Sequence, residues 1–250
     1  MTTISPQDFS SLVGGIAGGI PAASRDEMHG TTVIMLRFDG GVLSLADRRA
    51  TAGNLIMYDQ AEKIMSLDDD TVVAISGAFA RSIEVCRFLK HNLKYYRRSV
   101  MQEMSLEGKL AEISRALASN APMAMQGIGL FLPIVAAYDR KKDQFGVYFF
   151  DGAGARFQNG SYSCAGSGSE RIRGVFEYMS REKGKFETRP LAEVLDDGLK
   201  LLDIAADLDS ATGGFAKLPP VTRVLTRDGN REIEPNVLQA AMAKVLAHND

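Results

Sequence analysis

The pattern of hydrophobic and polar positions first becomes regular at Thr31. Residues 31–38 are mostly β-branched or apolar, Asp39-Gly40-Gly41 has the composition of a tight turn, and residues 42–46 are apolar again. Two such runs around a turn predict a β-hairpin. Residues 1–30 are rich in glycine and serine and show no sustained period, so we expect this segment to be loosely ordered or to act as an accessory arm.

Further strands and helices are predicted downstream. Residues 71–76 are apolar and end at Gly77, which indicates a short buried strand, and from Phe79 to Tyr96 apolar residues recur at helical spacings of three and four. Other helices are expected at residues 105–119, 169–180, 190–206 and 235–246, and further hairpins at residues 132–150 and 221–233. Strands therefore come in hairpins with helices grouped between them. This order argues against a doubly wound parallel sheet and favours the α+β class, with antiparallel sheets covered by helix layers.

Composition restricts the chemistry. The 250 residues fit one large domain or two small ones, and 29 Lys and Arg against 31 Asp and Glu argue against a basic nucleic-acid binder. With 3 His and 2 Cys, a His-rich metal site, a zinc ribbon or a disulfide scaffold has too few ligands. We expect no metal and no organic cofactor, and an enzyme of this composition should use a base other than histidine.

No targeting or membrane segment is predicted. Residues 12–20 are apolar but short, contain four glycines and follow no Lys or Arg, unlike a signal peptide. No later run is free of charge over the roughly 20 residues of a membrane span. Together with the low cysteine content, this predicts a cytoplasmic protein.

The hairpin that begins at Thr31 suggests a reaction that needs no histidine. Cleavage between Gly30 and Thr31 would put a hydroxyl and a free α-amine on one residue. An α-amine has a pKa of about 7.7–8.0, so near pH 7 a useful fraction is neutral and can take the hydroxyl proton. The site would also need a cation and a carboxylate to hold it, which Lys63 and Asp47 can supply.

The spacing of these residues resembles a known family. Asp47 and Lys63 follow Thr31 by 16 and 32 residues, the offsets of the N-terminal-nucleophile threonine proteases and, among them, the proteasome β subunits. Residues 40–51, 166–169 and 209–214 are similar to further elements of that family, and residues 29–32, 124–127 and 209–214 look most like its actinobacterial type. Thr2 is the other candidate nucleophile, but the same offsets counted from it reach Gly18 and Ile34, which can supply neither the carboxylate nor the cation.

The resemblance implies a fold, an activity and partners. The fold would be the four-layer α-β-β-α sandwich of the N-terminal-nucleophile hydrolases, with two antiparallel sheets. Residues 1–30 would be a propeptide removed by autocleavage, and residues 31–250 the peptidase domain of a 20S proteasome β subunit that degrades unfolded proteins in an enclosed chamber. Implied partners are seven-membered β rings stacked in pairs, α-subunit rings, an ATPase ring and substrates with a small protein tag, but no nucleic acid and no membrane.

The same resemblance assigns roles to residues. Thr31 would be the nucleophile, with Lys63 held by Asp47 to tune its charge. Ser167, Asp209 and Thr212 would support the nucleophile and its amine; Thr212 stands where many members have Ser and keeps the hydroxyl. Gly77 would bind the oxyanion through its backbone N–H. Substrate would pair with the main chain of Thr51 and place an apolar side chain in a pocket lined by Ala50, Ala61, Met65, Ile75 and Phe79.

Plainer interpretations exist for each residue taken alone. A Thr-Thr pair that opens a strand usually reflects β propensity, Asp47 a turn carboxylate and Lys63 a solvated surface lysine. The functional interpretation is favoured only because Gly30, Thr31, Asp47, Lys63, Ser167 and Asp209 all match the family together. Two functional alternatives also stay open: a non-catalytic ring subunit of the same fold, and another N-terminal-nucleophile amidohydrolase that acts on small molecules.

Overall fold

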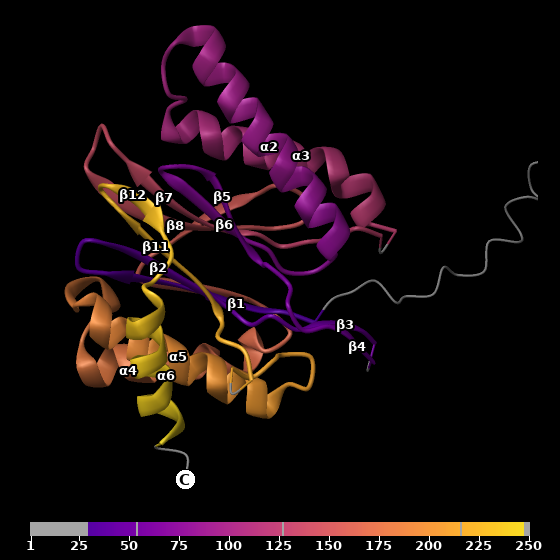
Figure 1. Cartoon of the computed structure of the whole chain (residues 1–250). Helices are drawn as coiled ribbons and strands as arrows, with labels where there is room; N and C mark the ends of the chain where they lie inside the picture. Colours follow the sequence, from indigo (N-terminus) through magenta and orange to yellow (C-terminus); the bar gives the residue numbers. More distant parts are fainter. Residues whose placement is uncertain (1–29, 54, 127, 216, 248–250) are drawn as a thin grey trace, which may run out of the picture.

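Two antiparallel sheets face each other at the centre of the molecule (Figure 1). The computed structural model describes residues 30–247 except positions 54, 127 and 216. The first sheet has the order β10-β1-β2-β11-β12. Its strands are β1 (Thr32–Phe38), β2 (Gly41–Ala46), β10 (Tyr162–Gly166), β11 (Val221–Thr226) and β12 (Gly229–Arg231). The predicted hairpin β1–β2 therefore lies in the middle of this sheet, with Val33 opposite Ala46.

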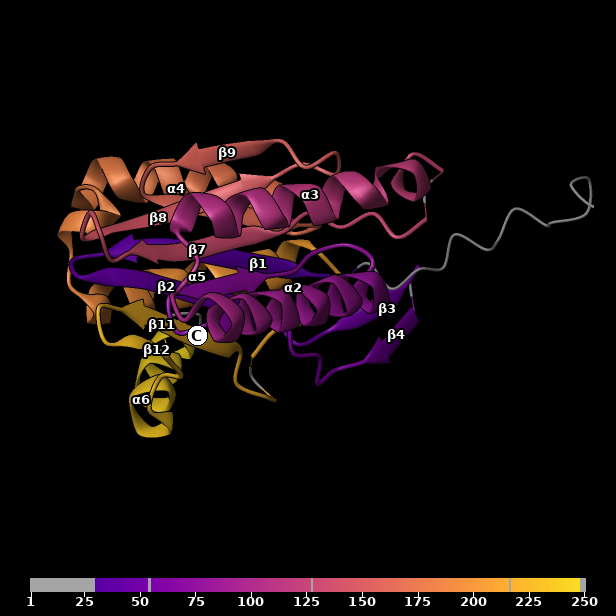
Figure 2. The same ribbon diagram turned by 90° about the horizontal axis from the view of Figure 1, so that it is seen from above.

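The second sheet has the order β5-β6-β7-β8-β9. Its strands are β5 (Ile64–Asp68), β6 (Thr71–Ala74), β7 (Ile134–Asp139), β8 (Gln144–Phe150) and β9 (Arg156–Asn159). A separate two-stranded ribbon, β3 (Ala50–Ala52) and β4 (Leu55–Tyr58), projects from one end of the sandwich (Figure 2). All four side chains of β4 are exposed although all are apolar or aromatic.

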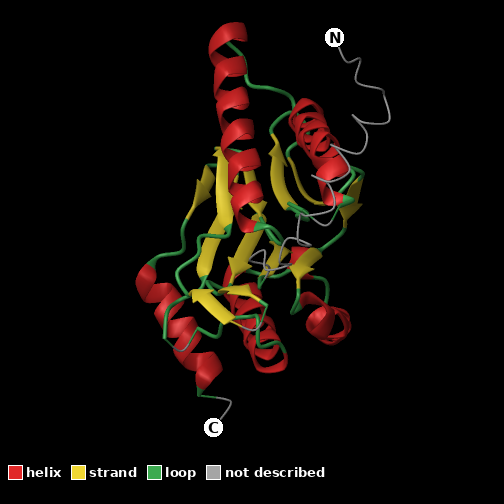
Figure 3. Ribbon diagram, turned by 90° about the vertical axis from the view of Figure 1, so that its right-hand side faces the viewer, coloured by secondary structure: helices red, strands yellow, loops and turns green. Residues whose placement is uncertain are grey.

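Helices cover the outer face of each sheet. On the second sheet lie α2 (Phe79–Val100) and α3 (Leu106–Ala124), side by side, and on the first lie α4 (Ser169–Lys183) and α5 (Leu191–Leu208) (Figures 1 and 2). A short 3-10 turn, η1 (Phe186–Thr188), links α4 to α5, and α6 (Pro235–Leu246) packs on α5. Figure 1 shows the resulting order of helix, sheet, sheet and helix, and Figure 3 shows helices on both sides of the strands. The predicted four-layer α-β-β-α sandwich is confirmed.

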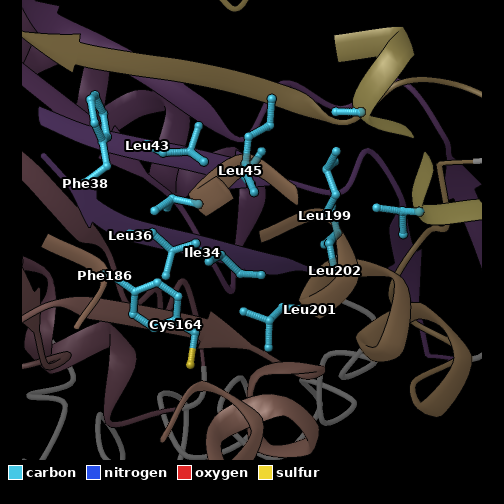
Figure 4. Packing of buried hydrophobic residues seen from close by; sticks show 14 of the residues in the cluster. Ile34, Leu36, Phe38, Leu43, Leu45, Cys164, Phe186, Leu199, Leu201 and Leu202 are labelled. Carbon is cyan, nitrogen blue, oxygen red and sulfur yellow. The ribbon is translucent and has the colours of Figure 1, made fainter. Parts of the chain in front are cut away.

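Three apolar cores hold these layers together. The core between the sheets is built of small and β-branched residues such as Val33, Ala46 and Ala136, which lets the sheets approach closely. Larger residues fill the two outer cores. Figure 4 shows part of the core under α5, where Leu199, Leu201 and Leu202 point toward Ile34 and Leu45 of the first sheet.

The hydrophobic pattern located the long elements better than the short ones. The helix expected at residues 235–246 has those bounds, and the helices expected from residues 79 and 169 begin there, although each runs a few residues further. Strands β3, β4, β5, β9 and β10 were not predicted, because runs of three to five residues give too little periodicity. Among the described helices, none has the length and apolar character that crossing a membrane requires.

Candidate active site

Chain segments far apart in sequence meet at one end of the sandwich. Thr31 precedes β1, Asp47 follows β2, and Lys63 precedes β5. The turn after β10 supplies Ser167, and the segment after α5 supplies Asp209 and Thr212. Hydrogen bonds join these six predicted residues into one cluster. Some run directly between their side chains, and others run through Thr32 or the backbone carbonyls of Gly30 and Thr31.

Asp47 and Lys63 form an ion pair with no access to solvent. Lys63 Nζ donates to Asp47 Oδ1 at 2.7 Å, and both side chains are 0% exposed. The same carboxylate accepts from the backbone N–H groups of Thr32, at 2.7 Å, and of Arg49 and Gly213, each at 2.9 Å. A buried carboxylate is tolerated only where such partners replace water, and these four hydrogen bonds do so for Asp47.

Lys63 also makes two bonds to backbone carbonyls. It donates to the carbonyl oxygen of Arg49 and, at 3.1 Å, to that of Gly30. The hydroxyl of Thr31 donates to the same Gly30 oxygen at 2.5 Å. Burial lowers the pKa of the Lys63 ammonium, while the Asp47 carboxylate opposes that effect. An ammonium group and a hydroxyl thus converge on the carbonyl oxygen of the Gly30–Thr31 peptide bond.

Ser167, Asp209 and Thr212 form a second polar group beside Thr31. Ser167 Oγ and Thr212 Oγ1 each donate to Asp209 Oδ2 at 2.6 Å, and Ser167 Oγ lies 3.5 Å from the carbonyl oxygen of Thr31. Partial burial alone would raise the pKa of Asp209, but these two hydroxyls and the N–H of Ala211 outweigh it and hold that pKa below its ordinary value. Asp209 is therefore a carboxylate at neutral pH.

Gly77 lies at a junction between strand and helix, as predicted. It follows β6 and precedes α2, with a φ of +99° that favours glycine. Ala78 N and Ser76 O are bonded to the segment that contains Phe131, but within the described part of the chain the N–H of Gly77 itself has no partner. Gly77 and Ser167 both line an open pocket of about 560 Å³. A free N–H donor thus borders space that a ligand can enter.

The residues predicted to bind substrate are only partly gathered. Ile75 is buried in the core under α2, and Met65 and Phe79 pack against that same core. Thr51 and Ala50 are buried in β3, and Ala61 bonds through its N–H to the carbonyl of Arg48 at 2.9 Å. Three of the apolar side chains therefore share one cluster, and the others lie on the neighbouring ribbon and the segment after it.

Sequence reasoning missed three contributors to the site, and one is Arg49, whose N–H donates to Asp47 and whose carbonyl accepts from Lys63. Gly213 donates its N–H to Asp47, and Thr32 contacts both Asp47 and Thr212. Gly213 lies inside a motif that the sequence analysis identified, but any residue except proline has a backbone N–H, so the residue type does not reveal this hydrogen bond. Thr32 is the second residue of a Thr-Thr pair, and the β propensity of threonine was a sufficient reason for its place in a strand, so no role in the site was predicted for it.

Comparisons with known proteins concern the chain as a whole and show its family. A family model described as Proteasome subunit matches residues 27–218. The chain belongs to the proteasome subunit family. A proteasome subunit beta of Frankia alni is 31% identical over 98% of this chain and 89% of its own length. Those of Acidimicrobium ferrooxidans and Streptomyces griseus are 34% and 33% identical, over 91% and 82% of this chain and 84% and 72% of their own lengths.

The family accounts for the type of fold and the type of assembly. The predicted resemblance to actinobacterial proteasome β subunits is confirmed, since these relatives span most of the chain. They belong to a threonine protease family, and a proteasome subunit assembles with other subunits into rings.

Proposed function

We propose that this chain is a threonine endopeptidase, made as a precursor that cuts itself between Gly30 and Thr31. The observation that carries the proposal is the convergence of Thr31 Oγ1 and Lys63 Nζ on the Gly30 carbonyl oxygen, at 2.5 and 3.1 Å. A solvated surface lysine, the plain interpretation of Lys63, does not fit a side chain that is 0% exposed. The protein family of the chain supports the same activity.

Gly30 itself fits a cleavage site. A Cβ at position 30 would lie 2.3 Å from Thr51 Oγ1 and 2.7 Å from the carbonyl oxygen of Ala211. Contacts under 3.0 Å require a neighbour to shift, and Ala211 contributes backbone. Any larger residue would therefore move the scissile carbonyl away from Lys63 and Thr31.

The proposed self-cleavage is an N-to-O acyl shift followed by hydrolysis. Thr31 Oγ1 attacks the Gly30 carbonyl carbon and gives up its proton to water, and the negative charge that forms on the Gly30 oxygen is stabilised by the Lys63 ammonium. The C–N bond then breaks as the nitrogen takes up a proton, which leaves residue 30 as an ester on Thr31. The α-amine of Thr31 is free from that point, and water then hydrolyses the ester to release the carboxylate of Gly30 and the hydroxyl of Thr31.

The new α-amine then acts as the base for substrate cleavage. It takes the proton of Thr31 Oγ1 during attack on a substrate carbonyl and passes it to the leaving nitrogen. Lys63, held by Asp47, stabilises charge on Oγ1, and the free N–H of Gly77 binds the oxyanion. Asp209, Ser167 and Thr212 orient the amine and a water. Water finally hydrolyses the acyl ester, so no cofactor is needed.

We further propose how substrate is held and where the work is done. Substrate pairs with Thr51 as an added strand and places an apolar side chain against Met65, Ile75 and Phe79, with Ala50 and Ala61 completing the pocket. The subunits form seven-membered β rings stacked in pairs, flanked by α-subunit rings and fed with unfolded, tagged polypeptides by an ATPase ring, in the cytoplasm. Enclosure keeps a peptidase of broad specificity away from folded proteins.

Intact mass and N-terminal sequencing of the purified protein, alone and with a candidate α partner, test the proposal. We expect a chain that starts at Thr31 and cleaves peptides after apolar residues. Thr31→Ala should stay full length and inactive. A wild-type chain that keeps its 250 residues and shows no activity with its partner contradicts the proposal and favours a non-catalytic ring subunit. Turnover of small amides without turnover of polypeptides would favour an amidohydrolase.

A further inference from the structure

Thr32 links the two polar groups of the site. Its side chain is fully buried, its N–H donates to Asp47 Oδ1 at 2.7 Å, and its hydroxyl lies 2.6 Å from Thr212 Oγ1. The hydroxyl proton of Thr212 goes to Asp209 Oδ2, also at 2.6 Å. Between the two threonines, Thr32 must therefore be the donor. One residue thus bonds the carboxylate that holds Lys63 and the hydroxyl that holds Asp209.

We propose that Thr32 is a positioning residue, which orients the Thr212 hydroxyl toward Asp209 and ties that group to the Asp47–Lys63 pair. The inference rests on the peptidase function proposed above. It concerns a residue that touches neither substrate nor the reacting atoms, so its effect is expected on the rate of turnover and not on substrate binding.

The surrounding backbone leaves space for this pair of hydroxyls. Gly168 follows Ser167 in the turn after β10, and a Cβ there would lie 2.4 Å from Thr32 Oγ1 and 2.7 Å from Thr212 Oγ1. Any side chain at position 168 would thus displace the hydrogen bond. Glycine at position 168 is therefore compatible with the hydrogen bond between Thr32 and Thr212, and a larger residue is not.

A strand-forming role alone predicts something different for Thr32. Valine has the shape of threonine and a high β propensity, so Thr32→Val would then be neutral. If the hydroxyl orients Thr212, valine removes the donor while serine keeps it. Thr71 at the start of β6 offers a matched control, because it is also fully buried and its hydroxyl has no partner within the described residues.

The first experiment measures peptide turnover by the full chain co-assembled with its α partner, per processed chain. We expect Thr32→Val to lower kcat about two- to tenfold, the worth of one hydrogen bond, with KM unchanged. Thr32→Ser should restore most of kcat, and Thr71→Val should match the wild type. Wild-type kcat in Thr32→Val, or a Thr32→Ser variant as slow as Thr32→Val, overturns the inference.

A second measurement does not need activity and separates the inference from the proposed function. Carbon-13 NMR of the Asp209 carboxyl group in the unprocessed Thr31→Ala chain follows its titration, with Asp209→Asn to assign the signal. The charged groups that act on this carboxylate are Arg171 of α4 and Lys63. Both stay in place in Thr32→Val, so a higher titration midpoint in that variant reports weaker donation by Thr212.

The outcomes of the NMR measurement are decisive in either case. Thr71→Val should leave the midpoint of Asp209 unchanged. An unchanged midpoint in Thr32→Val overturns the inference, whether or not the wild type is a peptidase. An inactive wild type combined with a raised midpoint would refute the proposed function and keep the coupling through Thr32.

Discussion

At the scale of single residues, Asp47 has a demanding position, because its carboxylate is removed from water and accepts four hydrogen bonds. Asp47→Ala would leave the Lys63 ammonium buried without its counter-ion. We expect a loss of about 3–5 kcal/mol in the free energy of unfolding. Equilibrium urea unfolding measures it, in a Thr31→Ala background that keeps all samples at one length.

A surface pair is the matched control for Asp47. Arg181 and Glu177 in α4 lie 2.8 Å apart, but their side chains are 77% and 52% exposed. Glu177→Ala should change the free energy of unfolding by at most about 0.5 kcal/mol. Equal effects of the two substitutions would show that the buried pair is not held as its geometry implies.

Asp209 makes stability depend on pH in a defined direction. Its pKa is lowered in the folded chain by Ser167 and Thr212, against the opposing effect of burial. Its contribution is then fully present above the unfolded pKa of about 3.9 and is lost as pH falls through the folded value. The difference in unfolding free energy between the parent and Asp209→Asn should therefore be larger at pH 6 than at pH 3. If the difference in unfolding free energy grew on acidification, the pKa of Asp209 would be raised and not lowered in the folded chain.

The sequence could predict which side chains meet in the site but not how they are held. Thr31, Asp47 and Lys63 were found from offsets that match a known family, and Ser167, Asp209 and Thr212 from motifs that resemble that family. The structure brings all six together. The donors of Asp47 are mostly backbone N–H groups, whose direction is set by loop geometry and not by residue type. Thr32 was equally hidden, because threonine is common in any strand.

At the scale of elements, the end of β10 fixes the start of β1. Gly166 pairs with Thr32 across the sheet, has a φ of +101°, and leaves no room for a side chain, since a Cβ would lie 1.9 Å from the Thr31 carbonyl oxygen. Gly166→Ala should therefore displace Thr31. Because a misplacement of about 1 Å can cost about 100-fold in rate, we expect processing to slow at least about tenfold. Mass spectrometry over a time course after synthesis measures it.

A second glycine controls for the general effect of alanine. Gly174 lies in α4, eight positions further on, and an added Cβ would meet nothing within 4 Å. Gly174→Ala should leave processing unchanged and stabilise the chain by about 1 kcal/mol, because alanine favours the helix. Processing of Gly166→Ala at the rate of Gly174→Ala would refute a positional role for β10.

The elements that sequence patterns missed share a physical cause. Strand β4 is apolar or aromatic but exposed at all four positions, and β9 is largely exposed and polar or aromatic, so neither shows the alternation of a half-buried strand. Strand β10 is only five residues long, and its partner β1 is 130 positions earlier in the chain. Pairing over such a distance is decided by the packed sheets and leaves no local signal.

At the scale of the whole molecule, the grouping of hairpins and helices was enough to predict antiparallel sheets covered by helix layers, because amphipathic elements bury their apolar faces in a small set of layered arrangements. The order of four layers was predicted from the family resemblance. The sheet order required the structure, since β10 and β11 flank the hairpin β1–β2 from late in the chain. The two sheets deliver their strand ends to the same edge. That edge carries Thr31, Asp47 and Lys63, so the packing of the two sheets brings residues that are 16 and 32 positions apart in sequence into one site.

Processing should change the charge of the whole molecule as well as its length. Residues 1–30 contain one base, Arg25, and three acids, Asp8, Asp26 and Glu27, so their loss raises the formal charge from -2 to zero. The mature chain should therefore focus at a higher pH than the precursor, whose isoelectric point is about 6.0. Two-dimensional electrophoresis should show a smaller, more basic spot in the wild type, while Thr31→Ala stays at the precursor position. The same shift in Thr31→Ala would mean that another protease removes the arm, and the intramolecular reaction would have to be abandoned.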